Sequence, residues 1–273
     1  MPDPFLIIPS KLSQLLNLGL EAGRAILEVY KTSFDVELKN DRSPITLADK
    51  HSHQILFEGL AGIGGFPIIS EEMREVPYKD RKHWNTFWLV DPLDGTKEFI
   101  KRNGEFTVNI ALIHDSTPVF GLIYVPVAGI FYYALKKQGA YKLTLESSHV
   151  IPNSYDEIIN QSKKLPIEHS PKGEYVIAVS RSHLSPKTVD YIRNKKAEYP
   201  VIRTIEAGSS LKFCLVAEGK ADDYPRFGPT MEWDTAAGQV IVTEAGKTLV
   251  GYDTLKPLAY NKPELLNPFF LVY

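Results

Sequence analysis

The stretch Trp88–Phe99, which reads WLVDPLDGTKEF, places two acids and a turn directly after an apolar run. The run over residues 86–90 is short, branched and aromatic, and this pattern predicts a buried strand. Asp91 and Asp94 follow it with Pro92 between them, and a proline cannot continue a central strand. Several oxygen ligands on a rigid turn are what a hard cation such as Mg²⁺ binds. A turn followed by an Asp-capped helix is the alternative, and the stretch taken alone favours it.

The same stretch ends at the start of a short helix, predicted over residues 97–100. Gly95 permits a turn that other residues resist. Thr96 stands at the expected N-cap position, where a hydroxyl accepts a backbone N–H. The turn therefore adds a hydroxyl to the two carboxylates.

Further acids lie at the ends of other predicted elements. Glu71 and Glu72 follow an apolar strand at residues 68–70, while Asp49 and Asp234 each lie in the first turn of a helix. Because the helix dipole favours a carboxylate in a first turn, Asp49 does not by itself indicate a site.

Apolar periodicity predicts α/β layering in two lobes. Helical spacing indicates helices over residues 11–30, 46–60, 186–194, 210–218 and 234–245. Four strand-like runs predict an antiparallel meander at 106–113, 119–125, 130–135 and 140–143, with further strands at 34–38, 175–179, 201–205 and 221–224. Residues 39–44 are predicted to be a loop, and residues 146–173 are polar and irregular. We expect tightly packed lobes at residues 1–150 and 151–273, the first carrying most of the acids.

In order and spacing these pieces resemble the lithium-sensitive, magnesium-dependent phosphomonoesterases related to inositol monophosphatase. The matching pieces are Glu71-Glu72, Asp91-Pro92-Leu93-Asp94-Gly95-Thr96 and Trp233-Asp234-Thr235-Ala236-Ala237-Gly238. The resemblance covers nearly the whole chain. Within the family the sequence most resembles the CysQ-type 3'(2'),5'-bisphosphate nucleotidases, and the segments that carry this likeness are Lys97–Ile113, Gly208–Asp222 and Tyr224–Gly238.

The resemblance implies a layered fold and a metal site. The fold is the αβαβα sandwich of the inositol monophosphatase and sugar phosphatase type, and the cofactor is Mg²⁺, as two or three ions. Glu71, Asp91 and the carbonyl of Leu93 would hold one ion. Asp91, Asp94 and Asp234 would hold a second. Four clustered carboxylates without cations repel one another, so we expect electrostatic strain in the metal-free site.

The resemblance also implies the catalytic groups. Thr96 and Asp49 resemble the family's water-activating pair, in which the carboxylate accepts from the threonine hydroxyl. Glu71, or its neighbour Glu72, would assist as a base or as a support for the ligands. The chain shows no cysteine or serine motif for covalent catalysis, which favours a water nucleophile.

Substrate contacts are expected around Gly208–Lys212 and Pro225–Phe227. Serines and backbone amides at a helix start favour an anion, although a serine-capped helix with a solvated lysine fits the composition equally well. Arg226 stands where inositol monophosphatases carry an acid, and a guanidinium suits a second phosphate or an adenine face. The full set of expected substrate contacts is Glu71, Leu93, Asp94, Gly95, Thr96, Lys97, Ser209, Ser210, Lys212, Arg226 and Asp234.

The implied activity is a phosphoric monoester hydrolysis. The enzyme would remove the 3'-phosphate of adenosine 3',5'-bisphosphate (PAP) to give AMP, with the sulfated form PAPS as a further substrate, in sulfate assimilation. The nearest alternative is an inositol monophosphatase. The evidence against it is the presence of three cationic residues, Lys97, Lys212 and Arg226. A non-catalytic sensor of metal and nucleotide is the remote alternative, and its mark would be the loss of a catalytic residue.

The bulk properties are those of an ordinary globular protein. A length of 273 residues with 44% hydrophobic and 23% charged residues allows a sizeable core. The net charge of −2 gives no reason to expect nucleic-acid binding. One cysteine, Cys214, rules out an internal disulfide and is expected to pack in the core.

The N-terminal residues lack the pattern of a signal peptide, and no apolar window is long enough to span a membrane. We therefore expect a cytoplasmic protein. Any association with the cytoplasmic side of the inner membrane would be peripheral. The sequence leaves open whether the chain is a monomer or a homodimer.

Overall fold

The computed structural model describes residues 3–38, 44–145, 150–168, 173–181 and 184–273. A seven-stranded sheet forms one layer of the molecule, and its strands follow the order β3-β4-β5-β6-β7-β8-β9. Only the pair β3–β4 is parallel, and the other neighbours within this sheet are antiparallel. This confirms the predicted meander. The strands are β3 (Ile68–Ser70), β4 (Thr86–Asp94), β5 (Thr107–His114), β6 (Thr117–Val125), β7 (Ile130–Leu135), β8 (Gly139–Thr144) and β9 (Lys163–Lys164).

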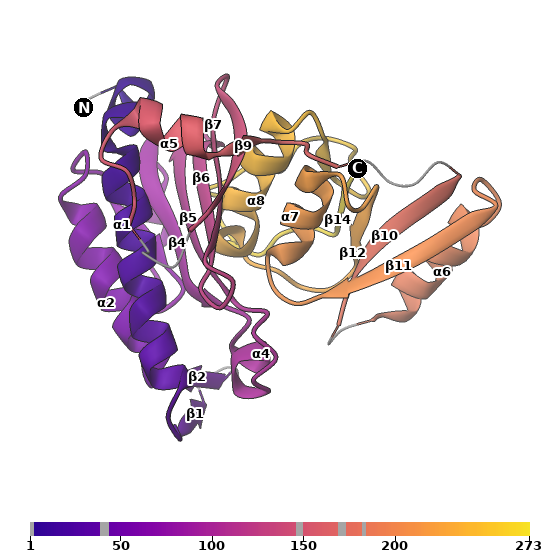
Figure 1. The fold of residues 1–273 in the computed structure, drawn as a ribbon, viewed down its shortest axis with the longest axis horizontal. Helices are drawn as coiled ribbons and strands as arrows, with labels where there is room; N and C mark the ends of the chain where they lie inside the picture. Colours follow the sequence, from indigo (N-terminus) through magenta and orange to yellow (C-terminus); the bar gives the residue numbers. More distant parts are fainter. Residues whose placement is uncertain (1–2, 39–43, 146–149, 169–172, 182–183) are drawn as a thin grey trace.

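Two long helices, α1 (Pro4–Tyr30) and α2 (Leu47–Ala61), cover one face of this sheet (Figure 1). Their apolar sides share a core with Trp88 and Phe120 of the sheet. Helix α1 begins at Pro4 and not at the predicted Lys11. The side chain of Asp3 accepts a hydrogen bond of 2.8 Å from the Phe5 N–H, and a proline is tolerated in the first turn, where its missing N–H has no helical partner.

Helices α7 (Leu211–Glu218) and α8 (Glu232–Glu244) cover the opposite face (Figure 1). Helix α8 crosses β6 closely because position 121 is a glycine: a Cβ there would lie 2.6 Å from the Ala237 carbonyl oxygen. Cys214 of α7 is buried in this second core, as predicted. These two helices from the later part of the chain are therefore anchored on the seven-stranded sheet.

A second layer of strands lies beyond α7 and α8. Strands β10 (Glu174–Ser180) and β11 (Val201–Ala207) are parallel, and β12 (Tyr224–Arg226), β14 (Phe270–Val272) and β13 (Leu249–Gly251) form an antiparallel set in that order. The Ala178 N–H donates to the Asp223 carbonyl at 2.7 Å, which joins the two sets. Helix α6 (Pro186–Lys195) covers the outside (Figure 1). The expected αβαβα layering is confirmed.

The remaining elements correct parts of the sequence prediction. The strand predicted at residues 34–38 is β1 (Val36–Leu38). The loop predicted at 39–44 is wrong at Pro44, which belongs to the partner strand β2 (Pro44–Thr46), and its other residues lie outside the described part of the chain. Residues 146–173 are not irregular throughout, because they contain α5 (Tyr155–Gln161) and β9, which pairs with β8. Two short helices, α3 (Tyr78–Arg81) and α4 (Thr96–Ile100), flank β4. The lobe boundary at residue 150 stays a prediction.

Among the described residues, no helix combines the length and the apolar character needed to cross a membrane.

Candidate active site

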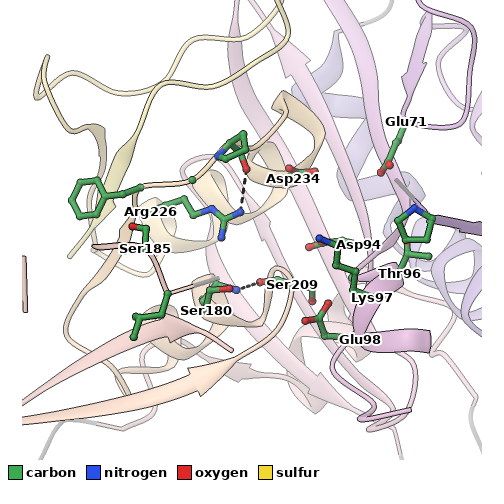
Figure 2. Close-up of a pocket in the computed structure, with 17 residues that line it drawn as sticks. Glu71, Asp94, Thr96, Lys97, Glu98, Ser180, Ser185, Ser209, Arg226 and Asp234 are labelled. Atoms are coloured by element: carbon green, nitrogen blue, oxygen red, sulfur yellow. Dashed lines mark hydrogen bonds between the residues drawn. The ribbon is translucent and has the colours of Figure 1, made fainter. Parts of the chain in front are cut away.

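A cleft of ≈ 680 Å³ lies between the end of β4 and the outer layer of strands. Figure 2 shows the carboxylates of Glu71, Asp94 and Asp234 directed toward one space, with Arg226 entering from the opposite wall. Most of the residues that the sequence marked as substrate contacts line this cleft, although they come from five separate segments of the chain. They are Glu71, Asp94, Gly95, Thr96, Lys97, Ser209, Lys212, Arg226 and Asp234.

Three carboxylates, those of Glu71, Asp91 and Asp234, form the acidic cluster, in which one ligand oxygen from each residue lies within 4.8 Å of the others. The parallel pairing of β3 with β4 sets Ser70 beside Val90 and so brings Glu71 alongside Asp91. Asp234 arrives in the first turn of α8, where its Oδ2 accepts the Met231 N–H at 2.8 Å. Residues distant in sequence thus meet at one point.

Burial and mutual repulsion hold these aspartates toward their neutral form. Burial, with the charges of Glu71, Asp94 and Asp234, raises the pKa of Asp91 well above its ordinary value. Burial together with Asp94 and Glu71 likewise raises the pKa of Asp234. A cation between these oxygens would remove both penalties. The donor set, all oxygen and strongly anionic, fits Mg²⁺.

Asp94 stands beside the acidic cluster and is oriented by polar side chains. Its Oδ2 accepts from Ser210 Oγ at 2.6 Å and from Asn109 Nδ2 at 3.4 Å. Burial raises the pKa of Asp94, while the bond from Ser210 and the charge of Lys212 oppose the shift. Ser210 and Asn109 are themselves joined at 2.8 Å.

The acidic turn, residues 91–96, departs from the sequence prediction in two respects. Strand β4 continues past Pro92 to Asp94, because a register shift between Asp91 and Asp94 lets the chain bulge without losing its pairing to β5. Thr96 is the first residue of α4 and not its N-cap. Gly95 holds the cap position with φ of 96°, a conformation that favours glycine.

Asp49 and Thr96 meet in the structure although they come from different helices. Thr96 Oγ1 donates to Asp49 Oδ1 at 3.1 Å and lies 3.4 Å from the Leu93 carbonyl oxygen. The other oxygen of Asp49 accepts the Thr46 N–H and hydroxyl, both at 2.7 Å. Asp49 therefore caps its own helix and also orients Thr96.

The serine turn, Gly208–Ser210, precedes α7 and faces the acidic turn. Lys212, expected to meet substrate, is buried, and its ammonium donates to the Ser209 carbonyl at 2.7 Å and the Ala207 carbonyl at 3.2 Å. Burial lowers the pKa of Lys212 to about 8, against the opposing charge of Asp94. Lys212 lines the cleft and supports the serine turn from within.

Arg226 and Lys97 supply positive charge at the cleft. The guanidinium of Arg226 donates from Nη2 to the Pro229 carbonyl at 3.1 Å. Its Nε is buried without a hydrogen-bond partner among the described residues. Lys97 is exposed on α4. The cleft is thus acidic at the β4 end and carries a guanidinium on the opposite wall.

Two polar residues of β5, Thr107 and Asn109, are both buried and were not predicted as part of the site. Asn109 holds Ser210 and Asp94, and Thr107 Oγ1 lies 3.3 Å from Ser209 Oγ. Polar residues in an otherwise apolar strand were the available signal, because a buried polar group needs a partner.

Comparisons with known proteins identify the family. The sequence profile of the inositol monophosphatase family matches residues 11–268. The chain belongs to the inositol monophosphatase family. A family member from Salmonella typhimurium, the 3'(2'),5'-bisphosphate nucleotidase CysQ, is 42% identical over 96% of this chain and 98% of its own length. The protein of the same name from Escherichia coli K12 is 41% identical with the same coverage.

A solved structure agrees with these sequence matches. The crystal structure of CysQ from Bacteroides thetaiotaomicron, a bacterial member of the inositol monophosphatase family, superposes with a TM-score of 0.87. It is 44% identical, and the match covers 98% of each chain. The family is metal-dependent, and the acidic cluster of this chain could hold a metal ion.

Proposed function

We propose that this chain is a 3'(2'),5'-bisphosphate nucleotidase that hydrolyses the 3'-phosphate of PAP to give AMP and phosphate in sulfate assimilation. PAPS is a second substrate of the same site. The observation that carries the proposal is the division of charge in one cleft, with carboxylates at one end and the guanidinium of Arg226 on the facing wall. The relatives at 41–42% identity carry the name of this activity.

The carboxylates would hold two or three Mg²⁺ ions. Glu71, Asp91 and the Leu93 carbonyl are the ligands of one ion, and Asp91, Asp94 and Asp234 those of a second. When bound there, Mg²⁺ supplies positive charge for the phosphoryl oxygens and for the attacking and leaving oxygens. Asp91 is shared between the two sets, which agrees with its place in the acidic cluster.

Thr96 orients the attacking water. Its hydroxyl proton points to Asp49 Oδ1 at 3.1 Å, so the lone pairs of Oγ1 are available to accept a hydrogen bond from a water in the cleft. Asp49 is buried and keeps this orientation because its second oxygen is fixed by Thr46. Glu71 or Glu72 assists as a base beside the water.

The facing wall selects the substrate. A bisphosphate keeps one phosphate that does not react, and the guanidinium of Arg226, which lines the cleft, is placed to meet it or the adenine. Lys97, Ser209 and the N–H groups at the start of α7 complete the anion-binding surface. Lys212 acts through its charge and through the turn that it supports.

A substrate panel tests the proposal. Phosphate release is measured from PAP, adenosine 2',5'-bisphosphate, AMP and inositol 1-phosphate, each with and without Mg²⁺, and with Li⁺ against an equal concentration of Na⁺. We expect Mg²⁺-dependent release that is fastest from PAP and is inhibited by Li⁺ alone. Faster release from inositol 1-phosphate would favour an inositol monophosphatase instead, and no release from any substrate would reject an enzyme of this class.

A further inference from the structure

Glu105 lies behind the cleft, at the point where the acidic turn and the serine turn come together. Its carbonyl oxygen would be 2.8 Å from a Cβ on Gly208, closer than a real Cβ allows, and 3.2 Å from a Cβ on Gly95, which is a tight contact. Gly95 belongs to the acidic turn and Gly208 to the serine turn. The backbone of Glu105 is therefore the spacer between them.

The side chain of Glu105 holds the serine turn directly. Its Oε2 accepts the Gly208 N–H at 2.8 Å. The same carboxylate receives a bidentate contact from Arg181, with Nε to Oε2 at 2.8 Å and Nη2 to Oε1 at 2.7 Å. Arg181 follows β10, and Nη2 also donates to the Glu206 carbonyl at 3.1 Å, so the end of β11 is held as well.

The serine turn in turn orients a predicted metal ligand. Ser210 Oγ donates to Asp94 Oδ2 at 2.6 Å and to the Asp234 carbonyl oxygen at 3.2 Å. A chain of contacts therefore runs from Arg181 through Glu105 and the Gly208 N–H to Ser210, and from there to Asp94. None of the first three groups is a ligand in the proposed metal site.

The contact between Glu105 and Arg181 is partly solvated, with 23% and 40% of the two side chains exposed. Exposed ion pairs contribute little to stability because water and salt screen them. Bidentate geometry, by contrast, fixes position and direction. The arrangement suits a role in geometry better than a role in holding the fold together.

We propose that Glu105 is a positioning residue for the reaction, which fixes the serine turn against the acidic turn and so orients Asp94 for Mg²⁺. The inference rests on the proposed metal-dependent hydrolysis. It predicts that the charge of Glu105 sets both turnover and the affinity for Mg²⁺, although Glu105 is not one of the residues that line the cleft. The role of Glu105 is not apparent in the sequence, because its partners lie 76 and 103 residues away.

The variants Glu105→Ala and Glu105→Gln test this role. Alanine removes all three acceptor contacts, and glutamine keeps one acceptor oxygen but turns N–H donors toward Arg181. We expect kcat with PAP to fall about tenfold to a hundredfold, the scale on which a misplacement of about 1 Å slows an enzyme. The Mg²⁺ concentration for half-maximal activity should rise, and calorimetry without substrate should show weaker Mg²⁺ binding.

Glu206→Gln is the matched control. It removes a carboxylate from the same arginine, at 3.4 Å from Arg181 Nη1, but that carboxylate is 59% exposed and contacts the arginine and not the serine turn. Its kcat and Mg²⁺ binding should equal those of the wild type. Arg181→Ala removes two contacts and leaves the Gly208 N–H bond to Glu105, so an intermediate loss is expected.

Two results would overturn the role of Glu105. One is wild-type kcat and Mg²⁺ binding in a folded Glu105→Ala protein. The other is a lowered melting temperature with kcat per folded molecule and Mg²⁺ affinity unchanged, which is the pattern of a structural residue. If the alanine variant does not fold, the glutamine variant and Arg181→Ala decide. A wild type that binds Mg²⁺ but leaves PAP intact would reject the proposed activity, while calorimetry would still test Glu105.

Discussion

At Asp91 a buried carboxylate, 1% exposed, stands among three other acids that raise its pKa. Asp91→Asn keeps the volume and removes the charge that both proposed ions share. We expect turnover of PAP to fall below detection in saturating Mg²⁺, while the circular dichroism spectrum stays that of the wild type. The melting temperature without metal should not fall, since one repelling charge is gone. Near-wild-type turnover would rule out the shared position of Asp91.

We expect Arg226 to determine which substrate the site prefers and not to take part in metal binding. Charged hydrogen bonds contribute roughly 1.5–3 kcal/mol, which corresponds to a loss of about tenfold to a hundredfold in kcat/KM when one is removed. Arg226→Ala should therefore slow hydrolysis of PAP by that factor. Hydrolysis of inositol 1-phosphate and the dependence on Mg²⁺ should stay unchanged. An equal loss on both substrates would mean that Arg226 supports the fold or the metal site.

Single residues were predictable where the chain itself carries the pattern. The acids at element ends and the turn at residues 91–96 are local features, and the family resemblance then related them to one another. The orientation of Lys212 was not predictable, because its carbonyl partners belong to a turn whose conformation the sequence does not specify. Asn109 and Glu105 could not be assigned, since their partners come from distant segments.

At the scale of elements, helix α6 is held to the outer strands through a buried acid. Asp223 accepts from the hydroxyls of Tyr191 on α6 and of Tyr175 on β10. Burial raises the pKa of Asp223 to about 6, although both tyrosines and the charge of Lys195 oppose the shift. The native state thus binds the proton more tightly than the unfolded chain, whose aspartate has an ordinary pKa of 3.8.

This shift predicts a pH dependence of stability. The contribution of Asp223 is most favourable below pH 4, is lost as the pH rises from about 4 to about 6, and is constant above that range. The variant Asp223→Asn has no carboxyl group to titrate at this position, so it does not lose stability through this group as the pH rises. The unfolding free energy of the variant relative to the wild type should therefore increase by about 1–3 kcal/mol between pH 4 and pH 6.5 in urea titrations. A difference that does not change with pH would contradict the shift.

Helices and strands were predicted well where the apolar periodicity extends over many residues. They were predicted less well where polar contacts determine where an element begins or whether it forms. The central strands and the later helices match their apolar patterns. Helix α1 starts before its predicted first turn because Asp3 caps it. Helix α5 was missed because it is short and polar, and it depends on the Ser154 cap and on burial of Ile158.

At the scale of the whole molecule, the acidic cluster joins the two halves of the chain. Glu71 and Asp91 belong to the large sheet, while Asp234 belongs to a helix that links that sheet to the outer layer. Binding of Mg²⁺ to the native state alone stabilises it by mass action, by about 2.7 kcal/mol at a hundredfold excess over Kd. We expect the melting temperature to rise from EDTA to saturating Mg²⁺, and to stay constant in Asp91→Asn. Equal shifts in both proteins would place the bound ion elsewhere.

The large sheet has a consequence for the synthesis of the protein. Its strands are neighbours in space in the order in which they occur in the chain. Contacts between successive segments can therefore form the sheet during translation. Helix α8, which covers the β6 face, is translated long afterwards. A nascent chain would therefore hold a formed sheet with one apolar face in water, a state prone to aggregation and suited to a chaperone. Mg²⁺ could stabilise such a nascent chain only after Asp234, one of the proposed ligands, had left the ribosome.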